Sequence, residues 1–313
     1  MEITRTQLEP NHVEEILEIA RRAQEEDGVA PLSEQFLVGL DDATLKHSHL
    51  VAQQAGRIIG VAAVDAGKPQ TAELVVDPQF RREGAGSALL KELGDTPVWA
   101  HGDLPEAQEL ARATGRSAGR TLLVMEIKDP DLADVTEVAE LPENYFLTDL
   151  TQAEQRWDVA WVLDQWLGAN NEAFDWHPEQ GGWDHERLER ALHAPWFRAT
   201  DVLFLWHFDS DGAPHLAGFH WTKWHTTDVT EGTGYGEVYV IGLASDFRGK
   251  QLGDPLLRAG LHHLYQRGAR KIILYVEDDN EPAVKAYKRL GFEVAENHVV
   301  YEVSDAAKDA DKE

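Results

Sequence analysis

The chain has 313 residues, of which 42% are hydrophobic, and its formal net charge at pH 7 is -27. At about 100–200 residues per domain, this length predicts two packed domains. The negative charge argues against nucleic acid or an anionic membrane as a partner, because both require clustered positive charge. There is no cysteine, which excludes disulfides, thiolate metal sites and a cysteine nucleophile.

The N-terminal segment, MEITRTQLEPNHVEE, is polar and acidic, so it lacks the basic and then apolar pattern of a signal peptide. No apolar run approaches the roughly 20 residues that span a membrane. We therefore predict a cytoplasmic protein. The C-terminal segment 305–313, DAAKDADKE, is predicted to be a solvated acidic tail.

In the first half of the chain, the spacing of apolar residues predicts an amphipathic helix over 13–24. Residues 49–65 predict a β-hairpin that turns near Gly56. In the second half, β-branched and aromatic residues predict strands at 202–208 and 215–224. They are followed by the short apolar run KIILYVE (271–277), which predicts a buried strand, and by a helix over 281–291 that Gly291 ends.

Two segments of the chain repeat each other: LVVDPQFRREGAGSALLKEL (74–93) and IGLASDFRGKQLGDPLLRAG (241–260). Each has a strand-like run, a basic loop with glycine and then a helical pattern, which indicates duplicated domains. Near the end of each half, Gly115 corresponds to Gly291 when a gap of nine residues is allowed. The aligned pairs within the segments are Phe80 and Phe247, Arg81 and Arg248, Gly86 and Gly253, Leu89 and Leu256, and Leu90 and Leu257.

The segment 129–144 is acidic and contains two prolines, which is typical of a linker. We predict a first domain over 1–130, a linker over 131–144, and a second domain over 145–304 before the tail. The strands and helices of the two halves predict an α/β fold class, as two tandem domains.

The first loop, RREGAG (81–86), opens a helix, where glycine permits close approach and free N–H groups attract a pyrophosphate. In the second loop, DFRGKQLGDPLL (246–257), Gln251 occupies a position where such a loop favours glycine. Because only glycine adopts positive φ at little cost, we expect Gln251 to have an ordinary backbone conformation and to offer its amide instead.

The two loops match the R/Q-x-x-G-x-G/A pattern of the GNAT superfamily of N-acetyltransferases, which the chain therefore resembles. The closing segment LYVEDDNEPAVKAYKRLGF (274–292) resembles that superfamily too, with asparagine after a strand and tyrosine on the next helix. The resemblance covers most of both halves. It implies tandem GNAT acyltransferase domains, with acetyl-CoA as co-substrate held in an opened mixed sheet.

Four phrases are similar to a narrower family of tandem GNAT enzymes, and HPEQGGW is the most specific of them. That family acetylates the cysteinyl amine of a cysteine–glucosamine–inositol conjugate, which the resemblance therefore implies as the small-molecule substrate. The phrases are DGVAPLSEQ (27–35), NNEAFDWHPEQGGW (170–183), GFHWTK (218–223) and GEVYVIGL (236–243).

Comparison of the two halves indicates that the second carries the chemistry. Counted from the loop arginine, Glu237 aligns with Gln70, and counted from the terminal glycine, Tyr287 aligns with Ala111. Acetylation of an amine needs a base and an acid, so we predict Glu237 as base and Tyr287 as acid. Each residue also has a structural alternative: Glu237 as a solvated strand carboxylate and Tyr287 as a core aromatic.

The resemblance implies coenzyme contacts in both halves, with the thioester oxygen bonded by backbone N–H groups near residues 241–243. Asn280, which aligns with Leu104, could equally cap the next helix. The implied contacts in the second half are Ile241, Gly242, Leu243, Arg248, Gly249, Lys250, Gln251, Leu252, Gly253, Asp254, Tyr275, Asn280 and Lys285. Those in the first half are Leu74, Val75, Val76, Arg82, Glu83, Gly84, Ala85, Gly86 and Ser87.

The resemblance also implies that Glu34, Glu179, Lys223 and Glu237 bind the substrate. Carboxylates suit sugar hydroxyls and an ammonium group, while lysine suits hydroxyl or carbonyl oxygens. The alternative for each of these residues is an ordinary charged side chain on the surface. No histidine has metal-ligand spacing, so we predict no metal. We expect a monomer.

Two other functions stay open. The chain could be a tandem GNAT enzyme for another amine, such as an aminoglycoside or a peptide N-terminus, or an acetyl-CoA-binding module without turnover. We expect the first half to lack catalysis, to have kept or lost acetyl-CoA binding, and to help form the substrate cleft through Glu34.

Overall fold

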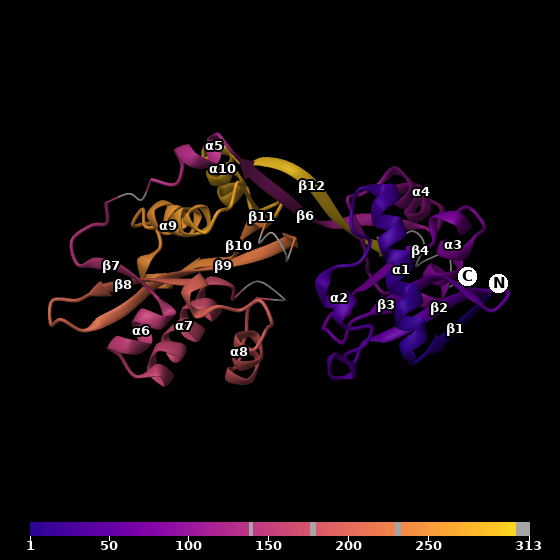
Figure 1. Cartoon of the computed structure of the whole chain (residues 1–313), viewed down its shortest axis with the longest axis horizontal. Helices are drawn as coiled ribbons and strands as arrows, with labels where there is room; N and C mark the ends of the chain where they lie inside the picture. Colours follow the sequence, from indigo (N-terminus) through magenta and orange to yellow (C-terminus); the bar gives the residue numbers. More distant parts are fainter. Residues whose placement is uncertain (138–139, 176–179, 229–232, 305–313) are drawn as a thin grey trace. The chain divides into compact units, whose positions relative to one another are not determined.

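The computed structural model describes residues 1–137, 140–175, 180–228 and 233–304, and divides into two compact units (Figure 1). Unit 1 comprises Met1–Leu123, Glu277–Asn280 and the C-terminal segment from Ala295. Unit 2 comprises Val124–Val276 and Glu281–Val294. Each unit is a mixed β-sheet with helices packed on it, which confirms the predicted fold class.

The sheet of unit 1 has its only parallel neighbours at β4 and β5 among the strand pairs whose registers are described. Its strand order is β1-β2-β3-β4-β5-β12-β6. The strands are β1 (Glu2–Thr6), β2 (Ser48–Gln54), β3 (Arg57–Val64), β4 (Ala72–Val76), β5 (Val98–His101), β12 (Glu293–Val303) and β6 (Arg116–Lys128).

The helices of unit 1 cover both faces of this sheet. Helix α1 packs on one face through Ile16, Ile19, Ala20 and Ala23, spaced as one helical stripe, and α3 packs on the other. The helices are α1 (Pro10–Asp27), α2 (Glu34–Val38), α3 (Ala85–Leu93) and α4 (Pro105–Ala113), with the short turns η1 (Ala43–Leu45) and η2 (Pro78–Phe80).

The sheet of unit 2 has the order β6-β11-β10-β9-β8-β7, with β10 and β11 parallel. The pairs β10–β9, β9–β8 and β8–β7 are antiparallel. The remaining strands are β7 (Tyr145–Asp149), β8 (Val202–Phe208), β9 (Pro214–Asp228), β10 (Thr233–Leu243) and β11 (Lys271–Glu277).

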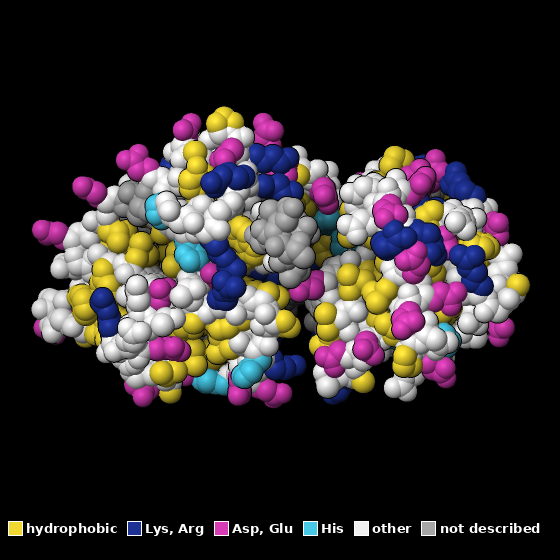
Figure 2. All heavy atoms as spheres, viewed as in Figure 1, with side chains coloured by type: hydrophobic (Ala, Val, Ile, Leu, Met, Phe, Trp, Pro, Cys, Tyr) yellow, Lys and Arg dark blue, Asp and Glu magenta, His cyan; other side chains and the backbone are white. Residues whose placement is uncertain are grey.

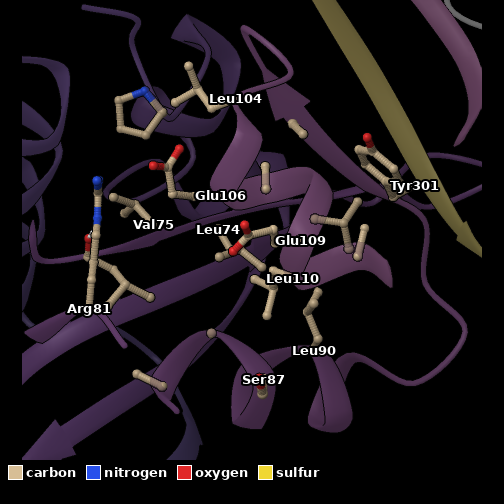
Figure 3. Close-up of a pocket in the computed structure, with 18 of the residues that line it drawn as sticks. Leu74, Val75, Arg81, Ser87, Leu90, Leu104, Glu106, Glu109, Leu110 and Tyr301 are labelled. Carbon is tan, nitrogen blue, oxygen red and sulfur yellow. Dashed lines mark hydrogen bonds between the residues drawn. The ribbon is translucent and has the colours of Figure 1, made fainter. Parts of the chain in front are cut away.

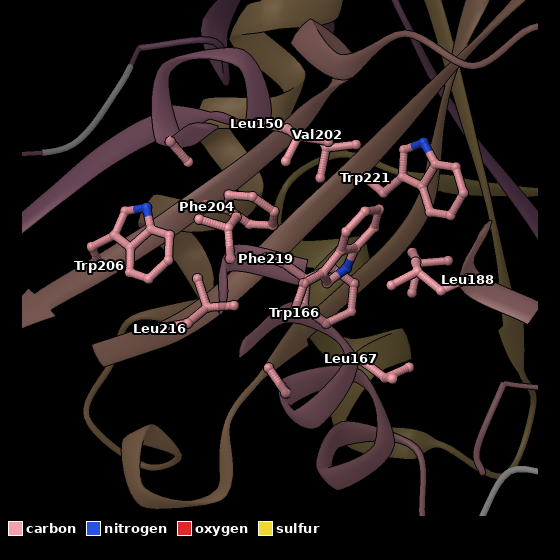
Figure 4. Packing of buried hydrophobic residues seen from close by; sticks show 14 residues of the cluster. Leu150, Trp166, Leu167, Leu188, Val202, Phe204, Trp206, Leu216, Phe219 and Trp221 are labelled. Carbon is pink, nitrogen blue, oxygen red and sulfur yellow. The ribbon is translucent and has the colours of Figure 1, made fainter. Parts of the chain in front are cut away.

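In unit 2, Figure 1 shows α6 and α7 on one side of β8 and β9 and α9 on the other. The first face is rich in aromatic side chains (Figure 4): Trp166 contacts the rings of Phe204 and Trp221 at centroid distances of 5.6 and 5.3 Å. Such large buried rings supply much of the packing energy. The helices are α5 (Asp131–Asp134), α6 (Leu150–Arg156), α7 (Val159–Ala173), α8 (His185–Leu192), α9 (Gly253–Gln266) and α10 (Glu281–Arg289), with η3 (Ala199–Asp201) and η4 (Ser245–Phe247).

The elements predicted from sequence are confirmed with small changes at their ends. The hairpin turns at Ala55 and Gly56, whose φ values are 50° and 78°, as a two-residue turn of the I′ type requires. The strands predicted at 202–208 and 271–277 have those bounds, and the helix predicted over 281–291 ends at Arg289.

The compact units do not follow the predicted boundary at 131–144. The division falls inside β6, and the last strand, β12, contributes most of its residues to unit 1. The predicted linker begins with α5, whose Leu132 is fully buried. Arg258 of α9 donates to the carbonyl oxygen of Val135. Two long strands thus carry the chain from one unit into the other, which composition does not reveal.

Strand β12 is joined to unit 1 by a buried polar cluster. His298 of β12 lies opposite His101 of β5, with their Nδ1 atoms 3.2 Å apart, and its Nδ1 accepts a hydrogen bond from the Gly102 N–H. His101 Nε2 is 3.0 Å from a carboxylate oxygen of Glu73 on β4. Burial, together with the nearby His101, lowers the pKa of His298 to about 4. The cluster is therefore built for a neutral His298.

This pKa predicts how stability depends on pH. Free histidine has a pKa of about 6.5, so the unfolded chain takes up the proton before the folded one. The contribution of His298 to the free energy of unfolding is complete above about pH 6.5. It falls by about 3 kcal/mol as the pH approaches 4. Urea unfolding at several pH values should show a weaker acid destabilisation in His298→Gln than in the wild type.

The control is His185→Gln, because His185 is exposed on α8. His220, whose pKa burial also lowers to about 4, is present in all three proteins and cancels in the comparison. An acid destabilisation that is identical in the wild type and His298→Gln would contradict this account of the cluster.

Candidate active site

The centre of unit 2 is a pair of parallel strands that part. β10 and β11 pair at Gly236–Ile272, Glu237–Ile273 and Val238–Leu274, and in the described residues their pairing ends there. On its other side β10 stays paired to β9, with a bulge at Tyr239 that shifts the register by one residue. Beyond the fork, the backbone of Ile241–Leu243 therefore has no β11 partner and is open to hydrogen-bond a ligand.

Glu237 lies at this fork and is only 5% exposed. Its carboxylate accepts a 2.5 Å hydrogen bond from His225 Nε2 on β9. Its direct neighbour across the strands is Lys223, which is 6% exposed. The carboxylate thus has a hydrogen-bond partner on one side and a cation as its cross-strand neighbour.

Lys223 lies in an aromatic setting. Its Nζ is 4.4 Å from the ring centroid of Trp196 and 5.6 Å from that of Tyr239. These rings stabilise the buried ammonium group by cation–π attraction. Lys223, which is predicted to bind the substrate, is thus a fixed cation on the strand next to the predicted base.

Tyr287 lies on α10, the helix that follows β11, and its ring contacts that of Phe292 at 5.8 Å. Burial raises its pKa to about 12. The phenol therefore keeps its proton throughout the neutral range and is able to donate it. Both predicted catalytic residues, Glu237 and Tyr287, belong to unit 2.

The loop after β10 connects the fork to α9. Arg248 donates to the backbone oxygens of Leu243 and Glu172, and the Glu172 side chain accepts from Ser245. Lys250 places its Nζ 4.8 Å from the Phe247 ring. These contacts hold the loop between α7 and α9, with the N-terminus of α9 available to an anion.

The ordinary backbone conformation expected for Gln251 is wrong, and the role of its side-chain amide stays a prediction. Its φ is +61°, in the left-handed region, and Gly249 has φ +74°. In the first loop Arg82 and Gly84 have φ values of 66° and 90°. Both loops thus make the same turn, and the adjacent Leu252, 1% exposed, anchors the second one. The anchored turn imposes a conformation that costs a residue with a Cβ about 1–2 kcal/mol.

The first loop borders a cavity of about 510 Å³ in unit 1 (Figure 3). In the described residues β4 and β5 pair at Ala72–Val98 and Glu73–Trp99 and not beyond, so these strands part as β10 and β11 do. The predicted first-half contacts that line the cavity are Leu74, Val75, Val76, Arg82, Gly84, Ala85, Gly86 and Ser87; exposed Glu83 is not among them.

The basic side chains of this first loop are paired within unit 1. Arg81 makes a bidentate ion pair with Asp27 at 2.7 Å, and Arg82 contacts Glu109 at 3.0 Å. Figure 3 shows Arg81, Glu106 and Glu109 beside the cavity. An anionic ligand would thus meet carboxylates here as well as arginines.

On the face shown in Figure 2, Asp and Glu are spread widely, while Lys and Arg form a few clusters.

The alignment of Glu237 with Gln70 needs correction. Gln70 precedes β4 and donates to the Asp65 backbone oxygen at 2.8 Å. Counting back from the loop arginine therefore misses the carboxylate of the first fork, which lies three residues further along the chain. Glu73, 2% exposed, lies at the first fork and accepts from the Ser33 N–H at 2.7 Å. The first half therefore does contain a buried carboxylate, but Ala111 supplies no phenol on α4.

The other predicted residues are placed as follows. Tyr275 follows the fork on β11 and is 47% exposed, and Asn280 directly precedes α10. Lys285 forms an exposed ion pair with Glu281, and Asp254 forms one with Arg258. Glu34 is exposed at the start of α2 in unit 1. Glu179 lies outside the described residues.

Sequence reasoning missed His225, Tyr235, Trp196 and the first-half cluster of Glu73 and His101. A signal was available for two of them. His225 is two residues after Lys223, and Tyr235 is two residues before Glu237, so strand periodicity places both on the face of the predicted base.

In the part of the chain that the structure describes, no group of three or more His, Asp or Glu side chains is arranged to hold a metal. The metal-free mechanism stays a prediction. None of the described helices is long and apolar enough to cross a membrane.

Two family models match the chain: an acetyltransferase (GNAT) domain over residues 46–118 and the acetyltransferase (GNAT) family over residues 170–292. A GCN5-related N-acetyltransferase from Sphaerobacter thermophilus aligns with a TM-score of 0.69 at 20% identity, covering 96% of each chain. A tandem GNAT protein from the clavulanic acid biosynthesis pathway aligns with a TM-score of 0.66 at 20% identity, covering 97% and 98%. The fold is thus that of a tandem GNAT acetyltransferase.

Closer relatives identify the family. The mycothiol acetyltransferase of Corynebacterium aurimucosum is 49% identical over 308 residues, covering 95% of this chain and 99% of its own length. That of Corynebacterium diphtheriae is 47% identical over 296 residues, covering 93% of each. This chain belongs to the mycothiol acetyltransferase family, and it is an acetyl-CoA-dependent N-acetyltransferase.

The matching loops predict what exchanging glutamine and glycine does. Gln251→Gly removes the backbone strain of a non-glycine residue at positive φ. It should leave the free energy of unfolding unchanged or raise it by up to about 1 kcal/mol. In the reciprocal variant Gly84→Gln the new Cβ has space, but glutamine is strained at this positive φ. The free energy of unfolding should therefore fall by about 1–2 kcal/mol. Urea unfolding measures both variants.

Acetyl-CoA affinity separates conformation from direct contact at position 251. If the backbone turn is what matters, Gln251→Gly binds acetyl-CoA at least as well as the wild type. A large loss of affinity with unchanged stability would show instead that the glutamine amide is a ligand.

Proposed function

We propose that the chain transfers the acetyl group of acetyl-CoA to the cysteinyl amine of a cysteine–glucosamine–inositol conjugate, the last step of mycothiol biosynthesis, and that unit 2 performs the reaction. The family relationship supports the substrate. The observation that carries the site assignment is the buried Glu237, hydrogen-bonded to His225 at the fork of β10 and β11.

In the proposed mechanism, Glu237 first takes a proton from the substrate ammonium group, directly or through one water. An α-amino group has a pKa of about 8, so the free amine forms readily near neutral pH. The amine then attacks the thioester carbon directly, and a C–N bond forms. With no cysteine in the chain, an acyl-cysteine intermediate is excluded.

As the thioester carbon becomes tetrahedral, negative charge develops on its oxygen. Backbone N–H groups of Ile241–Leu243 are proposed to stabilise that charge, because β10 has lost its β11 partner there. Holding both reactants along the same fork supplies much of the acceleration. The C–S bond then breaks and the thiolate leaves. The second amine proton passes to solvent, and solvent returns a proton to Tyr287 after that phenol has protonated the thiolate.

Tyr287 is proposed to protonate the departing thiolate. A phenol with a pKa of about 12 is a weaker acid than a thiol in water, whose pKa is about 8.5. Burial raises the pKa of a thiol as well, since it penalises the thiolate. Tyr287 therefore first stabilises the sulfur by donating a hydrogen bond, and the proton follows as charge accumulates in the same apolar surroundings.

The coenzyme is proposed to extend from the fork to the second loop, with its pyrophosphate at residues 248–254. Tyr275, Asn280 and Lys285 are proposed as further coenzyme contacts. The cavity of unit 1 is proposed to hold a second acetyl-CoA without turnover. Isothermal titration should then give two bound molecules per chain, whereas one per chain would contradict this second site.

Substitution of the two proposed catalytic residues tests the mechanism. Glu237→Gln should lower kcat/KM about 10²–10³-fold by removing the base. Tyr287→Phe should lower kcat while leaving acetyl-CoA affinity nearly unchanged, because its hydrogen bond strengthens only in the transition state. Unchanged turnover in either variant would remove that residue from the mechanism.

A CoA-release assay tests the substrate. We expect a clear preference for the cysteinyl conjugate over its glucosaminyl precursor and over an aminoglycoside. Preference for the aminoglycoside would support the alternative of a tandem GNAT enzyme for another amine. Absence of thiol release with every amine would support a binding module. The monomeric state and the cytoplasmic location stay predictions.

A further inference from the structure

His225 and Glu237 make a diagonal contact between neighbouring strands. In the β9–β10 register His225 lies opposite Tyr235, and Glu237 lies opposite Lys223. The imidazole nevertheless leans along the strands to Glu237, and Nε2 is 2.5 Å from Oε2. The side chains are 25% and 7% exposed. At this distance a proton lies between the two atoms. With Nε2 as the donor, Glu237 accepts the hydrogen bond through Oε2.

The ring of His225 is held in this orientation from the side. It stacks on Tyr235 with a centroid distance of 4.6 Å and an angle of 9° between the planes. Lys271 of β11 places its Nζ 4.8 Å from the Tyr235 ring and contacts Glu126 at 3.6 Å. The row from Lys271 through Tyr235 to His225 therefore fixes the direction of the hydrogen bond to Glu237.

The charged and titratable groups around Glu237 come from three strands. β9 supplies His225 and Lys223, β10 supplies Tyr235 and Tyr239, and β11 supplies Lys271 behind Tyr235. Of these, His225 makes the short charge-assisted bond to the carboxylate. Without a donor, a carboxylate this deeply buried would take up a proton at higher pH and stop acting as a base.

We infer that His225 is a positioning residue for acetyl transfer: it binds Oε2 of Glu237, fixes the orientation of the carboxylate and leaves Oε1 for the proton of the substrate ammonium. This inference rests on the proposed role of Glu237. It adds a residue that touches neither acetyl-CoA nor amine and acts only through the base.

Two substitutions separate the hydrogen bond from the stacking. His225→Phe keeps an aromatic ring against Tyr235 but removes the donor. His225→Gln keeps an N–H donor of similar reach but removes the ring. If His225 acts through the hydrogen bond, the acid limb of the kcat/KM profile moves to higher pH by about one unit or more in His225→Phe. Activity below that limb then falls about tenfold, while His225→Gln stays close to the wild type.

Acetyl-CoA affinity should be unchanged in both variants, since His225 is not among the proposed coenzyme contacts. The matched control is His215→Phe. His215 lies on the same strand and contacts the carboxylate of Asp209 at 3.0 Å, on the exposed surface. Its replacement should leave the pH profile where it is. If His225→Phe fails to fold, His225→Asn, whose amide is too short to reach Glu237, replaces it.

The failure of this inference differs from the failure of the proposed function. If Glu237→Gln is inactive and His225→Phe keeps the wild-type acid limb, the positioning role is wrong and the base assignment stands. If Glu237→Gln keeps full activity, the base assignment itself is wrong. If Glu237 is the base and His225 positions it, adding His225→Phe to Glu237→Gln causes little further loss of turnover, because the histidine acts through the missing carboxylate.

Discussion

In each unit, two parallel strands pair at only two or three residue positions in the described part of the chain and then part, and the other features of the site depend on this fork. Partial pairing leaves backbone N–H groups of one strand open to a ligand instead of a neighbouring strand. It also fixes where polar side chains are useful. Glu237 in unit 2 and Glu73 in unit 1 both lie where the pairing ends.

The buried carboxylates at the two forks have different partners. In unit 2 the buried carboxylate is bonded to His225, and a neutral phenol lies on α10. In unit 1 the carboxylate is bonded to the Ser33 N–H and lies beside His101, which adjoins His298 of β12. The same geometric opening thus serves a proposed reaction in one unit and helps to hold the last strand in the other.

The turn after each fork shows that backbone demand outweighs residue preference. Arg82 and Gly84 in the first loop, and Gly249 and Gln251 in the second, all have positive φ, so glycine and non-glycine residues exchange places within one turn. Glycine is preferred because it avoids a strain of about 1–2 kcal/mol, but the surrounding contacts can impose the conformation without it. A departure from a motif therefore does not prove a different backbone.

The sequence alone determined the duplicated organisation, the mixed α/β class, the forks' loops and the predicted acid and base, because apolar periodicity and glycine spacing are local properties of the chain. It did not determine the exchange of β6 and β12, the conformation of Gln251, the contact of His225 with Glu237 or the carboxylate cluster of Glu73. Each of these depends on strand register, on a bulge or on partners far apart in the chain. Only the folded sheet decides which side chains share a face and how far apart they lie.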